Sequence, residues 1–327
     1  MSDALLEVRG LRVRLPTASG LVTVVDGVDY RIERQQVFGV AGESGSGKTM
    51  SVLALLGLLP AGAVVEGEAL FEGRDLLRLS KQELRRVSGR EIAMVFQDPM
   101  TSLHPMLSVG TQLTEHTRKN LGLSRRDASA RAADLLAQVR LPDPVGALSR
   151  FPHQFSGGMR QRIAIAMALT CEPKVIVADE PTTALDVTVQ AGILRLLDRL
   201  RRETGLTIVL ITHDLGVMSS VADTVSIFYA GRVVETGAKT DVLQRPRHPY
   251  TRGLLRALPH PELGAHVPLV AIPGTPPSPQ LLPAGCAFHP RCQYASDRSV
   301  TEVPELVPVG GGRKLACHVD PFRGEAA

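Results

Sequence analysis

No apolar run in this sequence is long enough to cross a lipid bilayer. The longest, residues 52–65, is interrupted by Pro60 and falls short of the roughly 20 residues that a transmembrane helix needs. The N-terminal residues also lack the basic segment followed by an apolar one that marks a secretion signal. We therefore expect a cytoplasmic protein that reaches a membrane only through partners.

Cysteine is scarce, and no charge sign dominates. Four cysteines in 327 residues are too few for a disulfide framework, which favours a reducing compartment. The 37 lysines and arginines are mixed with 33 aspartates and glutamates, for a net charge of +4. This balance argues against a nucleic-acid partner. No long coiled-coil heptad pattern or solenoid repeat is evident either.

The sequence does contain the alternation of apolar β-branched runs and helical segments that is typical of an α/β fold with a parallel sheet. The expected strands are residues 6–8, 22–25, 37–40, 175–178, 207–211 and a β-rich stretch over 224–235. The expected helices are residues 50–59, 131–140 and 189–202.

The composition also predicts a division into domains. Residues 1–245 are expected to form one α/β domain with an antiparallel β region at its N-terminus and a helical insertion at about residues 100–160. Beyond about residue 245 proline becomes dense, so residues 246–327 are expected to form an irregular C-terminal extension with little helix.

A glycine-rich segment between a predicted strand and a predicted helix matches the complete pattern G-x-x-x-x-G-K-[ST]. Its members are Gly42, Glu43, Ser44, Gly45, Ser46, Gly47, Lys48 and Thr49. The N–H groups of such a loop wrap a β-phosphate, Lys48 reaches the β- and γ-phosphates, and the Thr49 hydroxyl takes a Mg²⁺ position. A purely structural turn is disfavoured because the match is complete and in the required context.

Two carboxylates, Asp179 and Glu180, end the predicted strand at residues 175–178. Ligands bind at this edge of a parallel sheet. Asp179 is expected to hold Mg²⁺ through water, and Glu180 to polarise the attacking water as general base. A structural role is disfavoured because two adjacent carboxylates repel each other without a cation.

The segment Ser156, Gly157 and Gly158 precedes a basic helical stretch opening at about Met159. Two glycines let backbone N–H groups approach an anion, and the helix dipole favours negative charge there. A plain helix N-cap is the other interpretation of the same residues.

Taken in order, these motifs resemble those of the ATP-binding subunits of ABC transporters, over roughly residues 5–240. The family has a P-loop NTPase core, so the resemblance implies binding and hydrolysis of ATP with Mg²⁺ at a dimer interface. It implies that Ser156, Gly157 and Gly158 contact the γ-phosphate of the partner's ATP. Gln97 resembles the glutamine that contacts Mg²⁺ and water, Asp186 the aspartate that crosses the interface, and His213 the histidine that contacts the γ-phosphate.

One position departs from the family pattern. Many members stack adenine on an aromatic residue before the first glycine-rich loop, where this chain aligns Leu15. An aliphatic side chain loses a stacking contribution of about 1 kcal/mol. We therefore expect GTP to be tolerated beside ATP.

Several sequence segments resemble those of the peptide and nickel importer subfamily, including residues 98–103, 151–162 and 248–251. Residues 272–277 and 285–292 resemble the C-terminal extension of oligopeptide and dipeptide permease ATPases. Met159, after the two glycines, resembles the residue that the D-type subunit of the ATPase pair has at this position. This resemblance implies a heterodimer with a second, related ATPase, two membrane permeases and an extracytoplasmic substrate-binding protein. It also implies a peripheral location at the cytoplasmic face of the inner membrane.

The extension of that family can hold an iron–sulfur cluster on four cysteines. Cys286, Cys292 and Cys317 match three of them, and the fourth position is Ser299. Three thiolates are one short for a four-iron cluster. Ser299, His289 or His318 are alternative fourth ligands, zinc is an alternative metal, and a metal-free remnant is the third interpretation.

The resemblance therefore predicts an ATPase that drives import of dipeptides or oligopeptides. Import of nickel or another small solute by the same family is the alternative. A non-transport ABC ATPase of DNA maintenance or translation is disfavoured, because neither a long coiled-coil insertion nor a second cassette is present. A silent regulatory subunit is disfavoured by the intact Lys48, Glu180 and His213.

Overall fold

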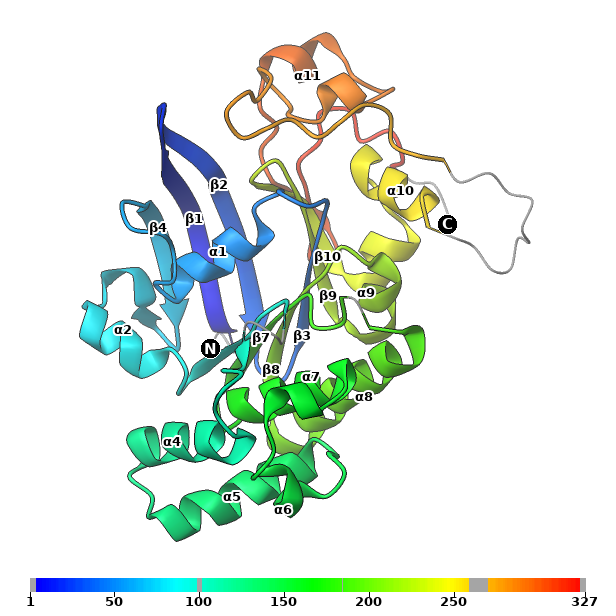
Figure 1. The fold of residues 1–327 in the computed structure, drawn as a ribbon. Helices are drawn as coiled ribbons and strands as arrows, with labels where there is room; N and C mark the ends of the chain where they lie inside the picture. The colour runs from blue at the N-terminus through cyan, green and yellow to red at the C-terminus, as the bar shows by residue number, and fades with distance from the viewer. Residues whose placement is uncertain (1–3, 99–101, 184, 259–269, 324–327) are drawn as a thin grey trace. The chain divides into compact units, whose positions relative to one another are not determined.

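The computed structural model describes residues 4–98, 102–183, 185–258 and 270–323. It divides into two compact units, one made of Met1–Arg78 with Ile211–Ala327 and the other of Leu79–Leu210. Figure 1 shows the helices and strands of both units, coloured from blue at the N-terminus to red at the C-terminus.

The first unit contains an antiparallel sheet in the order β2-β1-β4-β5. Its strands are β1 (Ala4–Thr17), β2 (Gly20–Glu33), β4 (Val64–Phe71) and β5 (Arg74–Asp75), followed by the 3₁₀ turn η1 (Leu76–Arg78). β1 and β2 are much longer than the apolar runs predicted, because bulges shift their register at several points and break the alternation of apolar and polar residues.

The same unit contains strands in the order β11-β12-β10-β9-β3. These are β3 (Val37–Ala41), β9 (Thr224–Tyr229), β10 (Arg232–Ala238), β11 (Val307–Gly310) and β12 (Arg313–Leu315). β3 and β9 are parallel, and all five residues of β3 are buried, as its continuous apolar run predicts. The helix predicted at residues 50–59 is α1 (Lys48–Leu55), which begins and ends earlier than predicted.

The remaining helices of the first unit follow residue 211 and lie in the C-terminal part of the chain. They are α9 (Leu215–Val221), the π-helical turn η3 (Thr240–Gln244), α10 (Pro249–Arg256), the 3₁₀ turn η5 (His289–Arg291) and α11 (Asp297–Thr301). The extension therefore contains elements that its proline content did not predict, among them the β11–β12 hairpin that pairs with β10.

The second unit contains strands β6 (Ile92–Val95), β7 (Val175–Asp179) and β8 (Thr207–Ile211), with β6 and β7 parallel. Every residue of β7 and β8 is buried. The helices are α2 (Lys81–Val87), α4 (Val109–Leu121), α5 (Arg125–Gln138), α6 (Pro144–Ala147), α7 (Gly157–Ala168) and α8 (Val187–Thr204), with a 3₁₀ turn η2 (Pro152–Gln154).

Most of these helices begin where a short polar side chain caps them. A side-chain oxygen accepts a hydrogen bond from a backbone N–H of the first turn, as N-cap residues do. The caps are Ser80 for α2, Ser108 for α4, Ser124 for α5, Ser156 for α7 and Asp186 for α8. Helices α4, α5 and α7 pack against one another (Figure 1). The helical insertion at about residues 100–160 stays a prediction.

Candidate functional site

The glycine-rich loop connects β3 to α1, and two of its glycines are required by the backbone. Gly42 has φ 147° and Gly47 has φ 97°, values that L side chains rarely adopt. A Cβ at Gly42 would lie 2.2 Å from the Phe228 carbonyl oxygen, and one at Gly47 would lie 2.6 Å from that of Val24. The loop therefore packs closely against β9 and β2, and only glycine fits at these two positions.

Lys48 is 5% exposed and folds back over its own loop. Its ammonium donates hydrogen bonds to the carbonyl oxygens of Gly42 at 2.8 Å and Glu43 at 2.9 Å, with the Ser46 hydroxyl at 3.5 Å. Thr49 follows in the first turn of α1, whose N-terminus carries partial positive charge. The loop thus holds one cation and a helix N-terminus together, as phosphate binding requires.

Two other predicted residues belong to the same unit. The Thr212 N–H donates to the Val40 carbonyl at 3.1 Å, so the exposed His213 follows directly after a contact with the strand that leads into the loop. Leu15 lies on β1 opposite Val22 and is half-buried. Its role toward adenine stays a prediction.

The second unit brings Gln97 and Glu180 together. Asp179 ends β7 and is 6% exposed, and Glu180 follows it with φ 46°, in the left-handed region. One Glu180 carboxylate oxygen accepts hydrogen bonds from the Gln97 amide at 2.8 Å and from the Thr183 hydroxyl at 2.9 Å. An unusual backbone conformation held by two side-chain donors is typical of a functional position.

The segment predicted to contact a γ-phosphate begins α7. Ser156 caps the helix by accepting from the Met159 N–H, so the N-cap interpretation is correct as far as local structure goes. A Cβ at Gly158 would lie 2.5 Å from a methyl group of Val189 on α8, so glycine is needed for the packing of α7 on α8. Asp186 caps α8 through the Val189 N–H at 2.9 Å. Neither cap involves the N–H groups of the exposed Gly157 and the half-buried Gly158, so neither cap excludes an anion there.

An apolar pocket of about 440 Å³ lies in the second unit beside the end of β6. Phe96, whose side chain is 43% exposed, lines it next to Gln97 in the sequence. Other lining residues come from α4 and α7, among them His116, Ala164 and Met167. Burial lowers the pKa of His116, so its ring is neutral in this apolar surrounding.

The three cysteines of the C-terminal extension are half-buried, and burial raises the pKa of each thiol. Ser299 is 6% exposed, and its hydroxyl bonds to Ser296 at 3.1 Å. Among the described residues, which include all three cysteines, no group of three or more His, Cys, Asp or Glu is arranged to hold a metal ion. The side chains therefore do not fit the predicted iron–sulfur cluster or zinc.

Sequence reasoning missed the contacts that the extension makes with the phosphate loop. The Glu43 N–H donates to the Tyr250 hydroxyl at 2.9 Å, and the Glu43 carboxylate accepts from the Arg291 guanidinium at 2.8 and 3.1 Å. Tyr250 and Arg291 both lie in sequence segments that resemble the subfamily. The residues beside them in the sequence do not indicate that they contact the phosphate loop.

Within the residues that the structure describes, no helix has the length and apolar character needed to cross a bilayer.

Comparison with known proteins relates the whole chain to one family. A family model described as ABC transporter matches residues 25–183, and one described as the oligopeptide/dipeptide transporter C-terminal region matches residues 234–298. The oligopeptide transport ATP-binding protein OppD of Haemophilus influenzae is 45% identical over 315 residues, covering 96% of this chain and 97% of that protein.

Two further comparisons agree with this one. The dipeptide transport ATP-binding protein DppD of Escherichia coli is 46% identical over 316 residues, covering 96% of each chain. A solved dimer of the ATP-binding cassette MJ0796 in a post-hydrolysis state, bound to ADP and Pi, aligns with a TM-score of 0.64 and 26% identity. That alignment covers 72% of this chain and 98% of the other.

Proposed function

The chain belongs to the ABC transporter family of ATP-binding subunits, and we propose that it drives the import of dipeptides or oligopeptides through membrane permeases. As a member of this family it binds and hydrolyses ATP. The match of residues 234–298 to the oligopeptide/dipeptide transporter C-terminal region supports peptides as the cargo.

The chemistry assigned to the site is phosphoryl transfer to water. Lys48 and the N–H groups of residues 42–49 bind the β- and γ-phosphates, and His213 contacts the γ-phosphate. Thr49, Gln97 and Asp179 would hold Mg²⁺, which when bound neutralises charge on the phosphate oxygens. Glu180 accepts a proton from the attacking water. The observation that carries this assignment is the hydrogen bond of 2.8 Å from the Gln97 amide to the Glu180 carboxylate, because it joins two of the assigned residues just after the ends of neighbouring strands.

The site is expected to be completed by a second ATPase. Ser156, Gly157 and Gly158 present a helix N-terminus for an anion, and we assign to them the γ-phosphate bound by the partner. Asp186 lies at the start of α8, next to this segment through the contact of Gly158 with Val189. We propose that the partner is a related but different ATPase and that this chain is the D-type subunit.

Two permeases are the proposed membrane partners, with an extracytoplasmic binding protein that supplies the peptide. The apolar pocket of about 440 Å³ beside Phe96 supports a docking place for a permease segment, because an exposed aromatic next to Gln97 links the contact to the catalytic residues. The chain would then lie at the cytoplasmic face of the membrane. The proposed function includes no iron–sulfur cluster.

Uptake of labelled peptides tests this proposal. Cells that produce the complete transporter should accumulate a labelled dipeptide or tetrapeptide, and the Lys48→Ala variant should abolish uptake because the phosphates lose their cation. Labelled Ni²⁺ serves as the competing cargo. Uptake of Ni²⁺ without uptake of either peptide would show that the cargo is assigned wrongly, and Lys48-independent uptake would contradict the ATPase role.

A further inference from the structure

Glu43, the first variable position of the phosphate loop, is held at all three of its polar groups. Its N–H donates to the Tyr250 hydroxyl at 2.9 Å, and its carbonyl accepts from the Lys48 ammonium at 2.9 Å. Its carboxylate accepts two hydrogen bonds from Arg291, at 2.8 and 3.1 Å. Two of these three contacts come from the C-terminal part of the chain, beyond residue 245.

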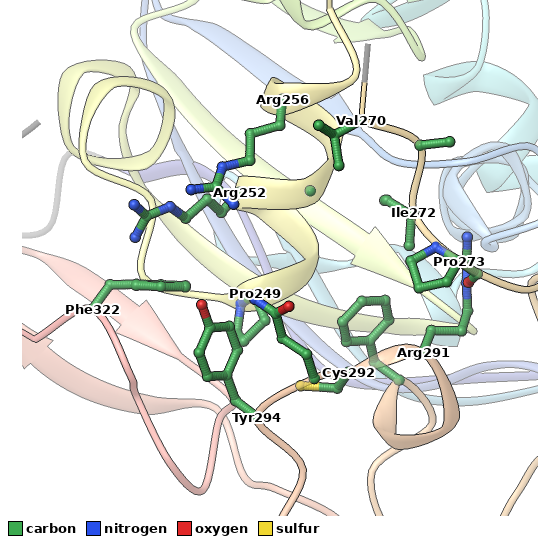
Figure 2. Close-up of a pocket in the computed structure, with 14 residues that line it drawn as sticks. Pro249, Arg252, Arg256, Val270, Ile272, Pro273, Arg291, Cys292, Tyr294 and Phe322 are labelled. Carbon is green, nitrogen blue, oxygen red and sulfur yellow. The ribbon is translucent and has the colours of Figure 1, made fainter. Parts of the chain in front are cut away.

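Arg291 is itself fixed from several sides. Its side chain is 5% exposed, its Nε donates to the Pro273 carbonyl at 2.9 Å, and Nη1 lies 3.4 Å from the Tyr229 hydroxyl. Figure 2 shows Arg291 next to Pro273 at the edge of a pocket of about 110 Å³. Burial alone would lower the pKa of Arg291, but hydrogen bonds with Glu43 and Tyr229 raise it above its ordinary value. The guanidinium is therefore charged and has a single well-defined position.

An aromatic cluster carries both contacts to the loop. Tyr229 at the end of β9, Tyr250 on α10 and Phe288 before η5 have ring centroids 4.6 to 5.4 Å apart. Burial raises the pKa of Tyr250, so its hydroxyl stays protonated and uncharged. Tyr250 and Arg291 thus approach Glu43 from one packed body rather than as separate surface side chains.

A bidentate pair between a guanidinium and a carboxylate fixes orientation as well as distance. Because Lys48 donates to the Glu43 carbonyl, the position of Glu43 also affects where the Lys48 ammonium lies. A loop released from Arg291 would gain conformational freedom, and ATP would have to remove that freedom on binding.

Resting on the proposed function, we propose that Arg291 is a positioning residue for nucleotide binding, through which the C-terminal extension holds Glu43 and the phosphate loop ready for ATP. Arg291 does not touch the nucleotide in this proposal; it acts through Glu43. The extension then supports the ATPase directly, through protein contacts alone.

The test measures ATP affinity of the purified chain by calorimetry and KM and kcat of the assembled transporter. We expect Arg291→Gln to weaken ATP binding and to raise KM about tenfold, with a smaller effect on kcat. Glu43→Ala should have a similar effect, and the double variant should be hardly worse than either single one, because both remove the same pair. Arg291→Lys should restore part of the affinity, since it keeps the charge but loses the fork.

Arg313→Gln is the matched control. Arg313 is also buried in the extension and also pairs with a carboxylate, that of Glu235. It donates hydrogen bonds to Glu235 and to the Arg245 carbonyl oxygen rather than to a residue of the loop. Equal loss of ATP affinity in Arg313→Gln and Arg291→Gln would overturn the proposal in favour of a general effect of the extension's stability. Normal ATP affinity in Arg291→Gln would overturn it as well.

Tyr250→Phe provides a second route if Arg291→Gln fails to fold. It keeps the ring in its cluster but removes the acceptor of the Glu43 N–H, so the proposal expects weaker ATP binding in this variant too, and unchanged binding rejects it. Lys48→Ala distinguishes failure of the Arg291 proposal from failure of the proposed function. Loss of binding in Lys48→Ala beside normal binding in Arg291→Gln rejects only the role of Arg291, whereas normal binding in Lys48→Ala rejects the proposed function itself.

Discussion

Gln97 and Glu180 are 83 positions apart in the sequence, yet the Gln97 amide donates a hydrogen bond of 2.8 Å to the Glu180 carboxylate. Thr183 donates to the same carboxylate oxygen at 2.9 Å, so two side chains fix the position of the Glu180 carboxylate. The backbone of Glu180 lies in the left-handed region, with φ 46°. A carboxylate that is oriented in this way before substrate arrives would need little rearrangement to act as the general base that we propose Glu180 to be.

The first prediction concerns Glu180→Gln. The amide cannot accept the proton of the attacking water, so ATP hydrolysis by the assembled transporter should fall by about two to four orders of magnitude. ATP binding should persist because Lys48 and the phosphate loop are intact. Steady-state phosphate release and calorimetric ATP binding check the two halves of this expectation.

Glu203→Gln is the control for that change, because Glu203 is an exposed carboxylate on α8 in a surface pair with Arg199. It should hydrolyse ATP at the normal rate. Sustained peptide transport by Glu180→Gln would refute the assignment of Glu180 as the base.

How far the sequence predicts this site depends on how local each signal is. The sequence predicts the phosphate loop because its glycine pattern follows an apolar run that is recognisable as a buried strand. It predicts the Asp179–Glu180 pair because two carboxylates follow a second such run. The contact of Gln97 with Glu180 is consistent with that reading, since β6 and β7 are parallel neighbours and both residues follow their carboxyl ends. The limits of the two domains, drawn at residue 245, stay a prediction.

Arg291 shows what sequence reasoning misses. It is 248 positions from Glu43, and an arginine in a proline-rich segment carries no local sign of its partner. The β11–β12 hairpin was missed for a related reason: its strands are short, and one contains Pro308, so neither shows an alternating pattern. Long-range pairing, rather than local propensity, orders the C-terminal extension.

The second prediction concerns nucleotide selectivity. Because Leu15 offers no aromatic ring to the base, the assembled transporter should hydrolyse both ATP and GTP at measurable rates. Leu15→Tyr should tighten nucleotide binding by an amount on the order of 1 kcal/mol through stacking. Competition of unlabelled GTP against labelled ATP measures both effects.

Leu21→Tyr is the control for stacking, because Leu21 is 50% exposed on the neighbouring strand β2. A strong preference of the native transporter for ATP over GTP would show that Leu15 does not relax selectivity. Equal gains from tyrosine at the two positions would show that the effect is not specific to residue 15.

The third prediction concerns the buried ion pair between Glu235 and Arg313. Glu235 is fully buried on β10 and also accepts hydrogen bonds from the N–H groups of Arg247 at 3.0 Å and His248 at 3.1 Å. Glu235→Ala would leave the guanidinium and two N–H groups without their acceptor, so the free energy of unfolding should fall by about 3–5 kcal/mol. Chemical denaturation followed by circular dichroism measures this loss.

A surface pair provides the comparison. Arg298 on α11 and Glu302, which caps the C-terminal end of this helix, also form an ion pair, but both side chains are more than half exposed. Glu302→Ala should therefore change stability little, because water solvates the remaining charge. A loss as small in Glu235→Ala as in Glu302→Ala would contradict the role of Glu235 in anchoring β12 to β10.

The fourth prediction follows from His248, which is 1% exposed and caps α10. Its Nδ1 accepts a hydrogen bond from the Tyr250 N–H at 3.1 Å, so the ring must be neutral at that nitrogen. Burial lowers the pKa of His248 to about 3. In the unfolded chain an ordinary histidine titrates near pH 6.5. Between these two values the unfolded chain binds a proton that the folded chain does not. The contribution of the neutral His248 ring to the free energy of unfolding is therefore fully present above about pH 6.5 and is lost as the pH falls toward 3.

His248→Asn tests this dependence, because asparagine also caps a helix but does not titrate. The free energy of unfolding of the native chain should fall more steeply than that of the variant below about pH 6.5, by up to about 1.4 kcal/mol per pH unit. Carboxylates that titrate in the same range affect both proteins and cancel in the difference. His153→Asn replaces an exposed ring on η2 and serves as the control. The free energy of unfolding of this variant should depend on pH as steeply as that of the native chain. Parallel slopes for the native chain and His248→Asn would mean that residue 248 takes up its proton without unfolding the cap of α10.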